Sequence, residues 1–259
     1  MIQLNLTGKK ALVCGASGGI GEATARLFAE AGAEVILLAR SEDKLIQLLQ
    51  ELPGSGHQYL CLDLANTHEV QNRIEKVLVN GPIHILVHNS GGPKGGALIE
   101  AKPEEFHTAF QNHLISAQTL AHLLVPGMRA EKYGRIINVI STSVKAPIPN
   151  LGVSNTIRGA MASWAKSLAN EVALHGITVN NVLPGYTLTS RLESLRKATA
   201  DRLKITESEV EKNWLASIPA GRFAKAEETA AAITFLASPL AAYINGINVP
   251  VDGGRTPSL

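Results

Sequence analysis

The sequence has few of the features that mark disulfide-stapled, metal-dependent or nucleic-acid-binding proteins. Among its 259 residues only Cys14 and Cys61 are cysteines, which leaves no disulfide framework and no zinc-ligand spacing. Both lie in strand-like runs, where we expect them to be small buried apolar side chains. The formal net charge is only +2, so no basic face favours nucleic acid. We therefore expect neither a metal centre nor a nucleic-acid partner.

Long hydrophobic runs are also missing. No apolar stretch reaches the ~18 residues of a membrane-spanning helix, and residues 1–10 lack the cationic and apolar regions of a signal peptide. We therefore expect a cytoplasmic protein that does not contact a membrane. Hydrophobic residues nevertheless make up 45% of the chain, which is enough for the core of one large domain.

What the chain does contain is an alternation of short apolar runs and longer helical patterns. Near-continuous apolar strands joined by helices indicate a parallel sheet buried on both faces. Right-handed crossovers then predict a single α/β domain with a doubly wound sheet, and a ligand site at the carboxyl ends of the strands. The expected strands are 11–14, 35–38, 59–62, 83–87, 135–140, 177–182 and a last one near 248; the expected helices are 21–31, one from 41, 67–79, 103–130 and 154–175.

One segment, residues 186–223, interrupts this rhythm. It is polar and helical and follows the carboxyl end of a strand, so it is expected to lie over the ligand crevice as a small helical lid on the substrate. A solvated surface helix explains the same pattern equally well.

A glycine-rich turn joins the first strand to the first helix. Gly15 permits a tight turn, Gly19 lets the backbone approach a pyrophosphate, and Gly21 lets the helix pack closely on the sheet. The helix N-terminus would then face the phosphates with free N–H groups. In this strand–turn–helix context the glycines predict a Rossmann fold that binds a dinucleotide.

The ends of the second and third strands bear on the choice of dinucleotide. Arg40 ends the second strand, where an acidic residue would favour NAD. Arg40, with Lys44 as a second candidate, would instead pair with a 2′-phosphate, so NADP is favoured over NAD. A solvated surface arginine is the alternative. Asp63 is placed to accept a hydrogen bond from the adenine amino group, or it is a turn or helix-capping residue.

Further motifs follow in order: the run from His88 to Gly91, Asn112, Ser141, Pro184 and Gly185 with Thr189, and the run from Val251 to Gly254. With the glycine turn and Asp63, they make the chain resemble the short-chain dehydrogenase/reductase family, in its acyl-carrier-protein ketoreductase-like branch, from Lys9 to Gly254. The resemblance implies a homotetramer with the Ser154 helix and the C-terminal strand at interfaces. It also implies a cofactor site made of Gly15, Ser17, Gly18, Gly19, Ile20, Gly21, Arg40, Asp63, Leu64, Asn89, Gly91, Arg158, Pro184, Gly185 and Thr189.

The chain departs from the family pattern at the catalytic residues. The family uses Tyr-x-x-x-Lys, whose tyrosine protonates the carbonyl oxygen and whose lysine binds the nicotinamide ribose and lowers the tyrosine pKa. Counting back from Gly176 and Asn180 puts Ser154 and Arg158 at these positions. They keep the i, i+4 geometry. A serine is a far weaker and shorter acid, however, and an arginine keeps its charge without giving up a proton.

Two smaller departures from the family pattern accompany these replacements. Cys14 replaces a threonine that ties the glycine turn to the loop after the fourth strand, and His88 replaces the first asparagine of that loop. Since the glycines and Asn89 remain, the cofactor site is expected to survive.

Another side chain would therefore have to replace the tyrosine as the proton donor. Tyr186 directly follows Pro184 and Gly185, near the expected nicotinamide end, and is the best substitute by type and place, although a lid residue packed on the sheet is the alternative. His113, Lys145 and Lys94 are weaker candidates, because a helical neighbour of Asn112 should point elsewhere and both lysines fit solvated loops.

These residues predict an NADP(H)-dependent oxidoreductase with a non-standard Asn112, Ser141, Ser154 and Arg158 site. Its small-molecule substrate would be a carbonyl or hydroxyl compound, or an enoyl compound such as a thioester. Some dienoyl-thioester reductases of the family also lack the tyrosine, and conjugate reduction depends less on a phenol. The alternative is a catalytically silent dinucleotide-binding sensor or assembly partner.

Overall fold

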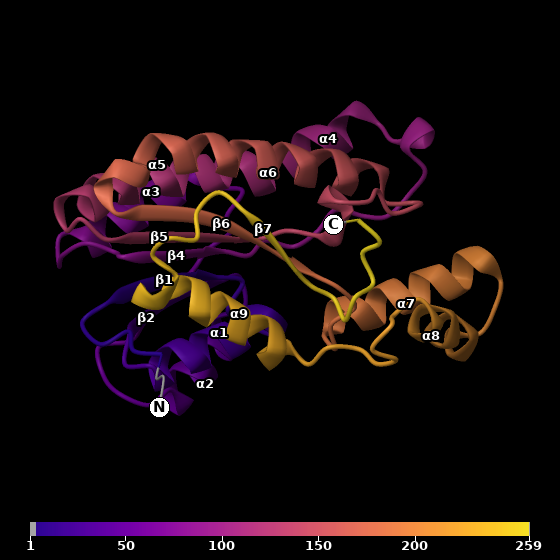
Figure 1. Cartoon of the computed structure of the whole chain (residues 1–259), viewed down its shortest axis with the longest axis horizontal. Coiled ribbons are helices and arrows are strands. Elements are labelled where there is room, and N and C mark those ends of the chain that lie inside the picture. Colours follow the sequence, from indigo (N-terminus) through magenta and orange to yellow (C-terminus); the bar gives the residue numbers. More distant parts are fainter. Residues whose placement is uncertain (1–3, 259) are drawn as a thin grey trace.

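The structure is a computed structural model, and it describes residues 4–258. The expected absence of a signal peptide concerns residues 1–10, of which the first three lie outside this range. At the centre is one parallel sheet of seven strands in the order β3-β2-β1-β4-β5-β6-β7 (Figure 1). The strands are β1 (Lys10–Cys14), β2 (Glu34–Ala39), β3 (Gln58–Cys61), β4 (Ile85–His88), β5 (Gly134–Val139), β6 (Ile177–Pro184) and β7 (Asn248–Val251).

Helices cover both faces of this sheet. Figure 1 shows α1 (Gly19–Glu30), α2 (Glu42–Glu51) and α9 (Ala226–Ala237) on one face. The other face carries α3 (Thr67–Leu78), α5 (Ser116–Ala130) and α6 (Gly152–Val172), with α4 (Pro103–Phe110) beyond one end. Apolar residues on the two sides of β1, β2, β4 and β5 enter two separate cores, as the near-continuous apolar strands require. The doubly wound α/β fold is thereby confirmed.

The strand order reverses direction between β1 and β4. Crossovers from these two strands leave toward opposite sides, so the loops that follow them separate and open a crevice at the carboxyl edge of the sheet. Residues 15–18 follow β1 and residues 89–97 follow β4. These are the two segments in which the sequence predicted the cofactor loops.

The expected helix over residues 103–130 is broken. The structure has α4, then a π turn over Gln111–Ile115, then α5. The Ser116 backbone N–H reaches back five residues to the Gln111 carbonyl oxygen, and the Ser116 hydroxyl donates to the Asn112 carbonyl oxygen at 2.7 Å. A π turn inside an α-helix adds a residue to the turn and redirects its side chains.

The polar segment 186–223 forms two helices, α7 (Ser190–Leu203) and α8 (Glu207–Ala216), which stand to one side of the sheet (Figure 1). Arg196 joins them by ion pairs to Glu207 at 3.0 Å and Glu211 at 2.7 Å. The ends of the segment are held together, because Ala224 N–H donates to the Tyr186 carbonyl oxygen at 2.9 Å.

The two cysteines have no disulfide partner, and they differ in burial. Cys14 is fully buried as expected, whereas Cys61, at the end of β3, is only partly buried. Within residues 4–258 no helix is long and apolar enough to cross a membrane. The same residues contain no group of three or more histidine, cysteine or acidic side chains placed to hold a metal ion.

Candidate active site

The turn after β1 is packed so closely that glycine is required at two positions. Gly15 has a φ of +66°, and a Cβ there would lie 2.6 Å from the carbonyl oxygen of Asn89. At Gly21 a Cβ would lie 2.1 Å from the carbonyl oxygen of Gly15. The turn, the start of α1 and the loop after β4 are therefore in direct backbone contact.

Cys14 preserves part of the tie for which the family uses a threonine. Its thiol hydrogen-bonds the Asn89 backbone, although burial dominates and raises the pKa of the thiol to about 12. Cys14 is thus a neutral packing residue under the crevice, and the contact between the two loops survives the replacement.

Most of the expected adenosine-side residues share one cleft of about 920 Å³. It runs along the carboxyl ends of β1, β2 and β3 and under the loop after β4, and pockets that hold small ligands commonly measure 300–1,000 Å³. The predicted cofactor residues in its wall are Gly15, Ser17, Arg40, Asp63, Leu64, Asn89 and Gly91.

The mouth of this cleft carries the group that bears on cofactor choice. The Arg40 Nη1 atom lies 3.7 Å from Asp63 Oδ2, and both side chains are largely exposed. Asp63 Oδ1 also accepts the Ala65 N–H at 3.0 Å, so the predicted turn role is present, whereas the cap of α3 is Asn66. Ser41 is the N-cap residue of α2, but its side chain makes no capping hydrogen bond. Ser41 also lines the cleft.

The glycine turn meets the lid at the other end of the crevice. A Cβ on Gly19 would lie 2.8 Å from the Thr189 Cγ2 atom, so the start of α1 touches the residue that caps α7. Gly18 begins α1 with no side-chain cap, which leaves N–H groups of its first turn unsatisfied by side chains. Pro184 and Gly185 end β6 beside Asp252, in the turn after β7.

Ser154 and Arg158, which the sequence predicts at the positions of the family tyrosine and lysine, lie in the first two turns of α6. Ser154 is half-buried in the first turn, and Arg158 is 7% exposed in the second. The Arg158 Nη1 donates to the Val139 carbonyl oxygen at 3.1 Å, at the end of β5 and two residues before Ser141. The Ser141 hydroxyl accepts the Ser143 N–H at 3.1 Å. The ends of β5 and α6 therefore meet at the site.

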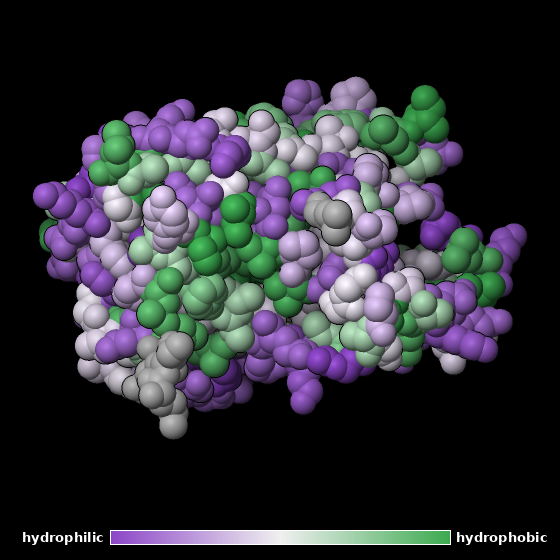
Figure 2. Space-filling model, in the orientation of Figure 1, coloured by the Kyte–Doolittle hydropathy of each residue, from purple (hydrophilic) through white to green (hydrophobic). Residues whose placement is uncertain are grey.

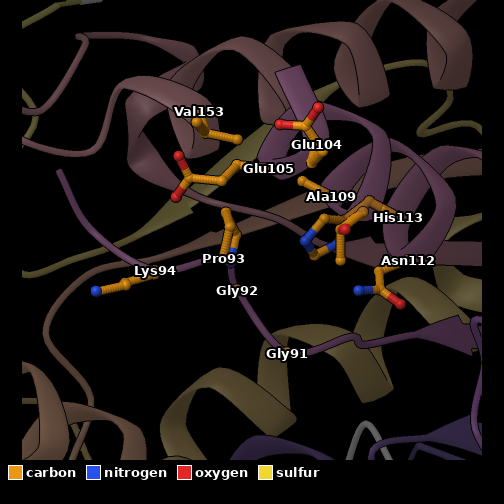
Figure 3. Close-up of a pocket in the computed structure, with 11 residues that line it drawn as sticks. Gly91, Gly92, Pro93, Lys94, Glu104, Glu105, Ala109, Asn112, His113 and Val153 are labelled. Atoms are coloured by element: carbon orange, nitrogen blue, oxygen red, sulfur yellow. The ribbon is translucent and has the colours of Figure 1, made fainter. Parts of the chain in front are cut away.

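Asn112 lies on the π turn and lines a second, smaller cavity of about 300 Å³. The expectation that His113 should point elsewhere is wrong, because the π turn brings both side chains to this cavity. Figure 3 shows the His113 ring between Ala109 and Asn112. The two cavities share Gly91, Gly92, Thr108 and Asn112, so the smaller one continues the larger cleft.

Two buried histidines lie in this part of the fold, His113 in the cavity wall and His88 at the end of β4. His113 Nδ1 is hydrogen-bonded to Ser90 Oγ, and His88 Nε2 to Ser116 Oγ at 2.9 Å. Burial, together with the positive charge of Arg158, lowers the pKa of His113 to about 2 and that of His88 to about 3. Both rings are therefore neutral at ordinary pH, and His113 Nε2 has no hydrogen-bond partner in the described structure.

Tyr186 is built into the base of the lid. Its ring stacks on Trp214 with centroids 4.6 Å apart, and Phe223 meets it edge-on at 6.0 Å. Arg255 lies over the ring and donates to the phenol oxygen at 3.4 Å. Burial raises the pKa of Tyr186 above its usual value, against the opposing effect of Arg255. These contacts favour a packing role within the lid.

Of the weaker lysine candidates, Lys94 lines the smaller cavity and Lys145 lies exposed after Ser141. No sequence motif points to Arg191, which lies in the first turn of α7. Its Nη2 donates to the Pro93 carbonyl oxygen at 2.9 Å and so joins the lid to the loop after β4.

Comparison with known proteins agrees with this geometry. Residues 15–256 match the family described as enoyl-(acyl carrier protein) reductase. The chain is 37% identical over 254 residues to the 3-oxoacyl-[acyl-carrier-protein] reductase of Vibrio cholerae, covering 97% of this chain and 98% of the relative. The uncharacterized oxidoreductase YvrD of Bacillus subtilis is 33% identical over the full length of both chains.

Solved structures show the same fold. The NADPH-dependent reductase YwfH of bacilysin biosynthesis superposes with a TM-score of 0.92 at 26% identity, over 97% of this chain and 99% of that one. The L-sorbose reductase of Gluconobacter frateurii, complexed with NADPH and L-sorbose, gives a TM-score of 0.91 at 32% identity over 100% of both chains. The chain therefore belongs to the short-chain dehydrogenase/reductase family of oxidoreductases.

Proposed function

We propose that this protein is an NADP(H)-dependent oxidoreductase that acts on a small carbonyl, hydroxyl or enoyl compound with a non-standard active site. The observation that carries the proposal is one continuous crevice. Its larger part is lined by seven of the residues predicted for the cofactor, and its smaller part by Asn112.

The residues present fit NADP. The uncapped start of α1 suits a pyrophosphate, and the exposed Arg40 guanidinium at the cleft mouth suits a 2′-phosphate. Thr189, Pro184 and Gly185 would hold the nicotinamide end. When bound, the cofactor supplies or accepts a hydride.

The chain's own residues would bind and polarise the substrate. Ser141 and Ser154 offer hydroxyls to its oxygen, Asn112 orders the site, and Arg158 holds ribose hydroxyls and adds positive potential. Arginine stabilises negative charge without releasing its proton. A proton would therefore come from water or through Ser154, while Tyr186 supports the lid.

This division of roles favours conjugate reduction of an enoyl compound. A hydride added to carbon leaves negative charge on an oxygen, where the Arg158 charge and serine hydroxyls stabilise it. Protonation can follow as a separate step, so a phenol at position 154 is less necessary. The structural relative YwfH is described as an NADPH-dependent reductase, which agrees with the proposed cofactor.

Calorimetry with NADPH and NADH is the first test, followed by NADPH consumption with ketones, aldehydes and enoyl thioesters. We expect tighter binding of NADPH and turnover best on a conjugated substrate. Absence of binding to either cofactor would refute the proposal. Binding without turnover on the whole panel would support the silent dinucleotide-binding protein instead.

We also propose the homotetramer that the family resemblance implies. Figure 2 shows hydrophobic residues gathered over α9 and β7. Exposed large side chains in and between these elements are Phe235, Leu240, Tyr243 and Ile247. Light scattering on the purified protein would test the assembly, and a monomeric mass would contradict it.

A further inference from the structure

Two arginines from different elements converge on the loop after β4. A Cβ placed on Gly92 would lie 3.4 Å from Arg191 Nη2 and 3.7 Å from Arg158 Nη2. Arg158 comes from α6 and Arg191 from α7, the first lid helix. The two guanidinium groups therefore face one small region beside a glycine that leaves room for another group.

Both charges lie outside the ion pairs of the described structure. No carboxylate lies within ion-pair distance of Arg158 or Arg191 in the part of the chain that the structure describes. The hydrogen bonds of both guanidiniums go to backbone carbonyls, at Val139 and Pro93. The buried Arg158 Nε has no partner at all in the described structure. Burial first, and then the like charge of Arg191, lowers the pKa of Arg158 to about 10.

An unpaired buried cation is costly, and two facing cations repel each other. An anion between them would remove both penalties. A carboxylate suits the arrangement well, because each guanidinium offers a planar fork of N–H donors that matches two carboxylate oxygens.

The region borders the smaller cavity. Gly92, Lys94, Asn112 and His113 line it, so the arginine pair approaches its wall at Gly92, and the cavity carries one positive side chain of its own. Its acidic side chains, Glu104 and Glu105, lie beside Val153, across the cavity from Gly91 and Gly92 (Figure 3). Glu105 accepts the Lys102 N–H at 2.8 Å, in the cap of α4. The cavity volume of about 300 Å³ is at the lower end for ligand pockets and suits a small molecule.

We propose that Arg191 and the Nη2 end of Arg158 form a subsite for a carboxylate of the substrate, so that the protein acts on a small oxo or enoyl acid. The substrate class rests on the proposed oxidoreductase function, but the anion subsite does not depend on turnover. Arg191 is the specificity-determining residue, since it forms no ion pair with a carboxylate in the described structure and links the lid to the loop after β4. The other source of such an anion is a phosphate of the dinucleotide.

The test compares matched acids and amides by calorimetry, with the protein alone and saturated with NADP+. Acetoacetate against acetoacetamide, and crotonate against crotonamide, differ in charge at nearly constant shape. We expect each acid to bind at least tenfold more tightly than its amide. Arg191→Gln should abolish that preference and leave the Kd for NADPH within about twofold. Arg191→Lys, which keeps the charge without the fork, should restore part of the preference.

Arg202→Gln is the matched control, because it removes one exposed charge from the same helix and should leave the preference intact. Equal binding of acids and amides by the unmodified protein would overturn the proposal. So would an Arg191→Gln variant that weakens NADPH binding tenfold and keeps the acid preference, which would assign Arg191 to a cofactor phosphate. Failure of NADPH to bind, with the acid preference intact, would refute only the oxidoreductase function.

Discussion

Arg40 and Asp63 lie side by side in the wall of the larger cleft, with Arg40 Nη1 3.7 Å from Asp63 Oδ2. Arg40 directly follows β2, and Asp63 lies two residues after the neighbouring strand β3. Because the pair is exposed, its own Coulomb attraction adds little to stability. The arrangement therefore leaves the guanidinium free to exchange the carboxylate for a phosphate.

Replacing Arg40 is expected to change cofactor preference. Arg40→Gln should weaken NADPH binding by about ten- to a hundredfold, since a hydrogen bond to a charged group contributes roughly 1.5–3 kcal/mol. NADH binding should change less than threefold, because NADH has no 2′-phosphate. Calorimetric titration of both cofactors measures this. Lys44→Gln is the control, since Lys44 does not line the cleft; equal losses for NADPH and NADH would contradict the assignment.

The glycine turn predicts a contrast between two neighbouring positions. Gly21→Ala would place a Cβ 2.1 Å from the Gly15 carbonyl oxygen, whereas at Gly18 nothing lies within 4 Å. Gly21→Ala is therefore expected to cost about 1–3 kcal/mol of stability through overpacking, and to weaken NADPH binding. Gly18→Ala should stay within about 0.5 kcal/mol of the unmodified protein. Urea unfolding measures both, and equal stabilities would contradict the close packing at Gly21.

Sequence patterns were sufficient for the parts of the site fixed by backbone geometry. Gly15, Asp63 and Asn89 lie at the carboxyl ends of strands, and parallel strands bring such ends to one edge of a sheet. The alternation of apolar runs specified those strands to within two residues at most ends.

The sequence patterns do not predict the π turn or the arginine pair. Residues 103–130 have an unbroken helical periodicity, and the extra residue of the π turn shows only in the hydrogen bonds around Ser116. Regular helical geometry therefore predicts that the neighbours Asn112 and His113 face different directions, whereas both line the smaller cavity. Arg191 approaches Arg158 because the lid brings α7 to the loop after β4. No local sequence pattern encodes a contact between segments so far apart in the chain.

Restoring the family's residue pair is expected to increase carbonyl reduction. The double variant Ser154→Tyr, Arg158→Lys should raise NADPH consumption with a 3-oxoacyl thioester at least tenfold, because a positioned general acid contributes typically 10²–10⁴-fold. Ser154→Phe, Arg158→Lys adds the same bulk without the phenol and serves as the control. If the two double variants are equally active, the missing phenol is not what limits ketone reduction.

Tyr186 is expected to act through its ring. Tyr186→Phe keeps the stacking on Trp214 and loses only the 3.4 Å hydrogen bond from Arg255, so turnover should stay within about twofold. Tyr186→Ala removes the ring from a half-buried cluster and should destabilise the protein by about 3 kcal/mol or more. Steady-state kinetics and thermal unfolding separate these outcomes. A hundredfold loss of kcat in Tyr186→Phe, at unchanged stability, would instead make the phenol the proton donor.

The buried histidines predict how stability depends on pH. Burial, with the charge of Arg158 as the smaller cause, holds the pKa of His88 near 3 and that of His113 near 2, whereas an unfolded histidine titrates near 6.5. Between these values the unfolded chain binds more protons, so the free energy of unfolding rises with pH and is lost as pH falls below about 6.5. Each ring should remove about 2 kcal/mol by pH 5, at roughly 1.4 kcal/mol per pH unit. Urea unfolding at pH 7 and pH 5 measures the loss.

Two variants test whether the buried rings cause this loss of stability. Since His122 is exposed on α5, the His122→Gln variant should lose as much stability between pH 7 and pH 5 as the unmodified protein. The His88→Asn variant should lose only about half as much. An unchanged loss in His88→Asn would show that His88 does not stay neutral in the folded protein.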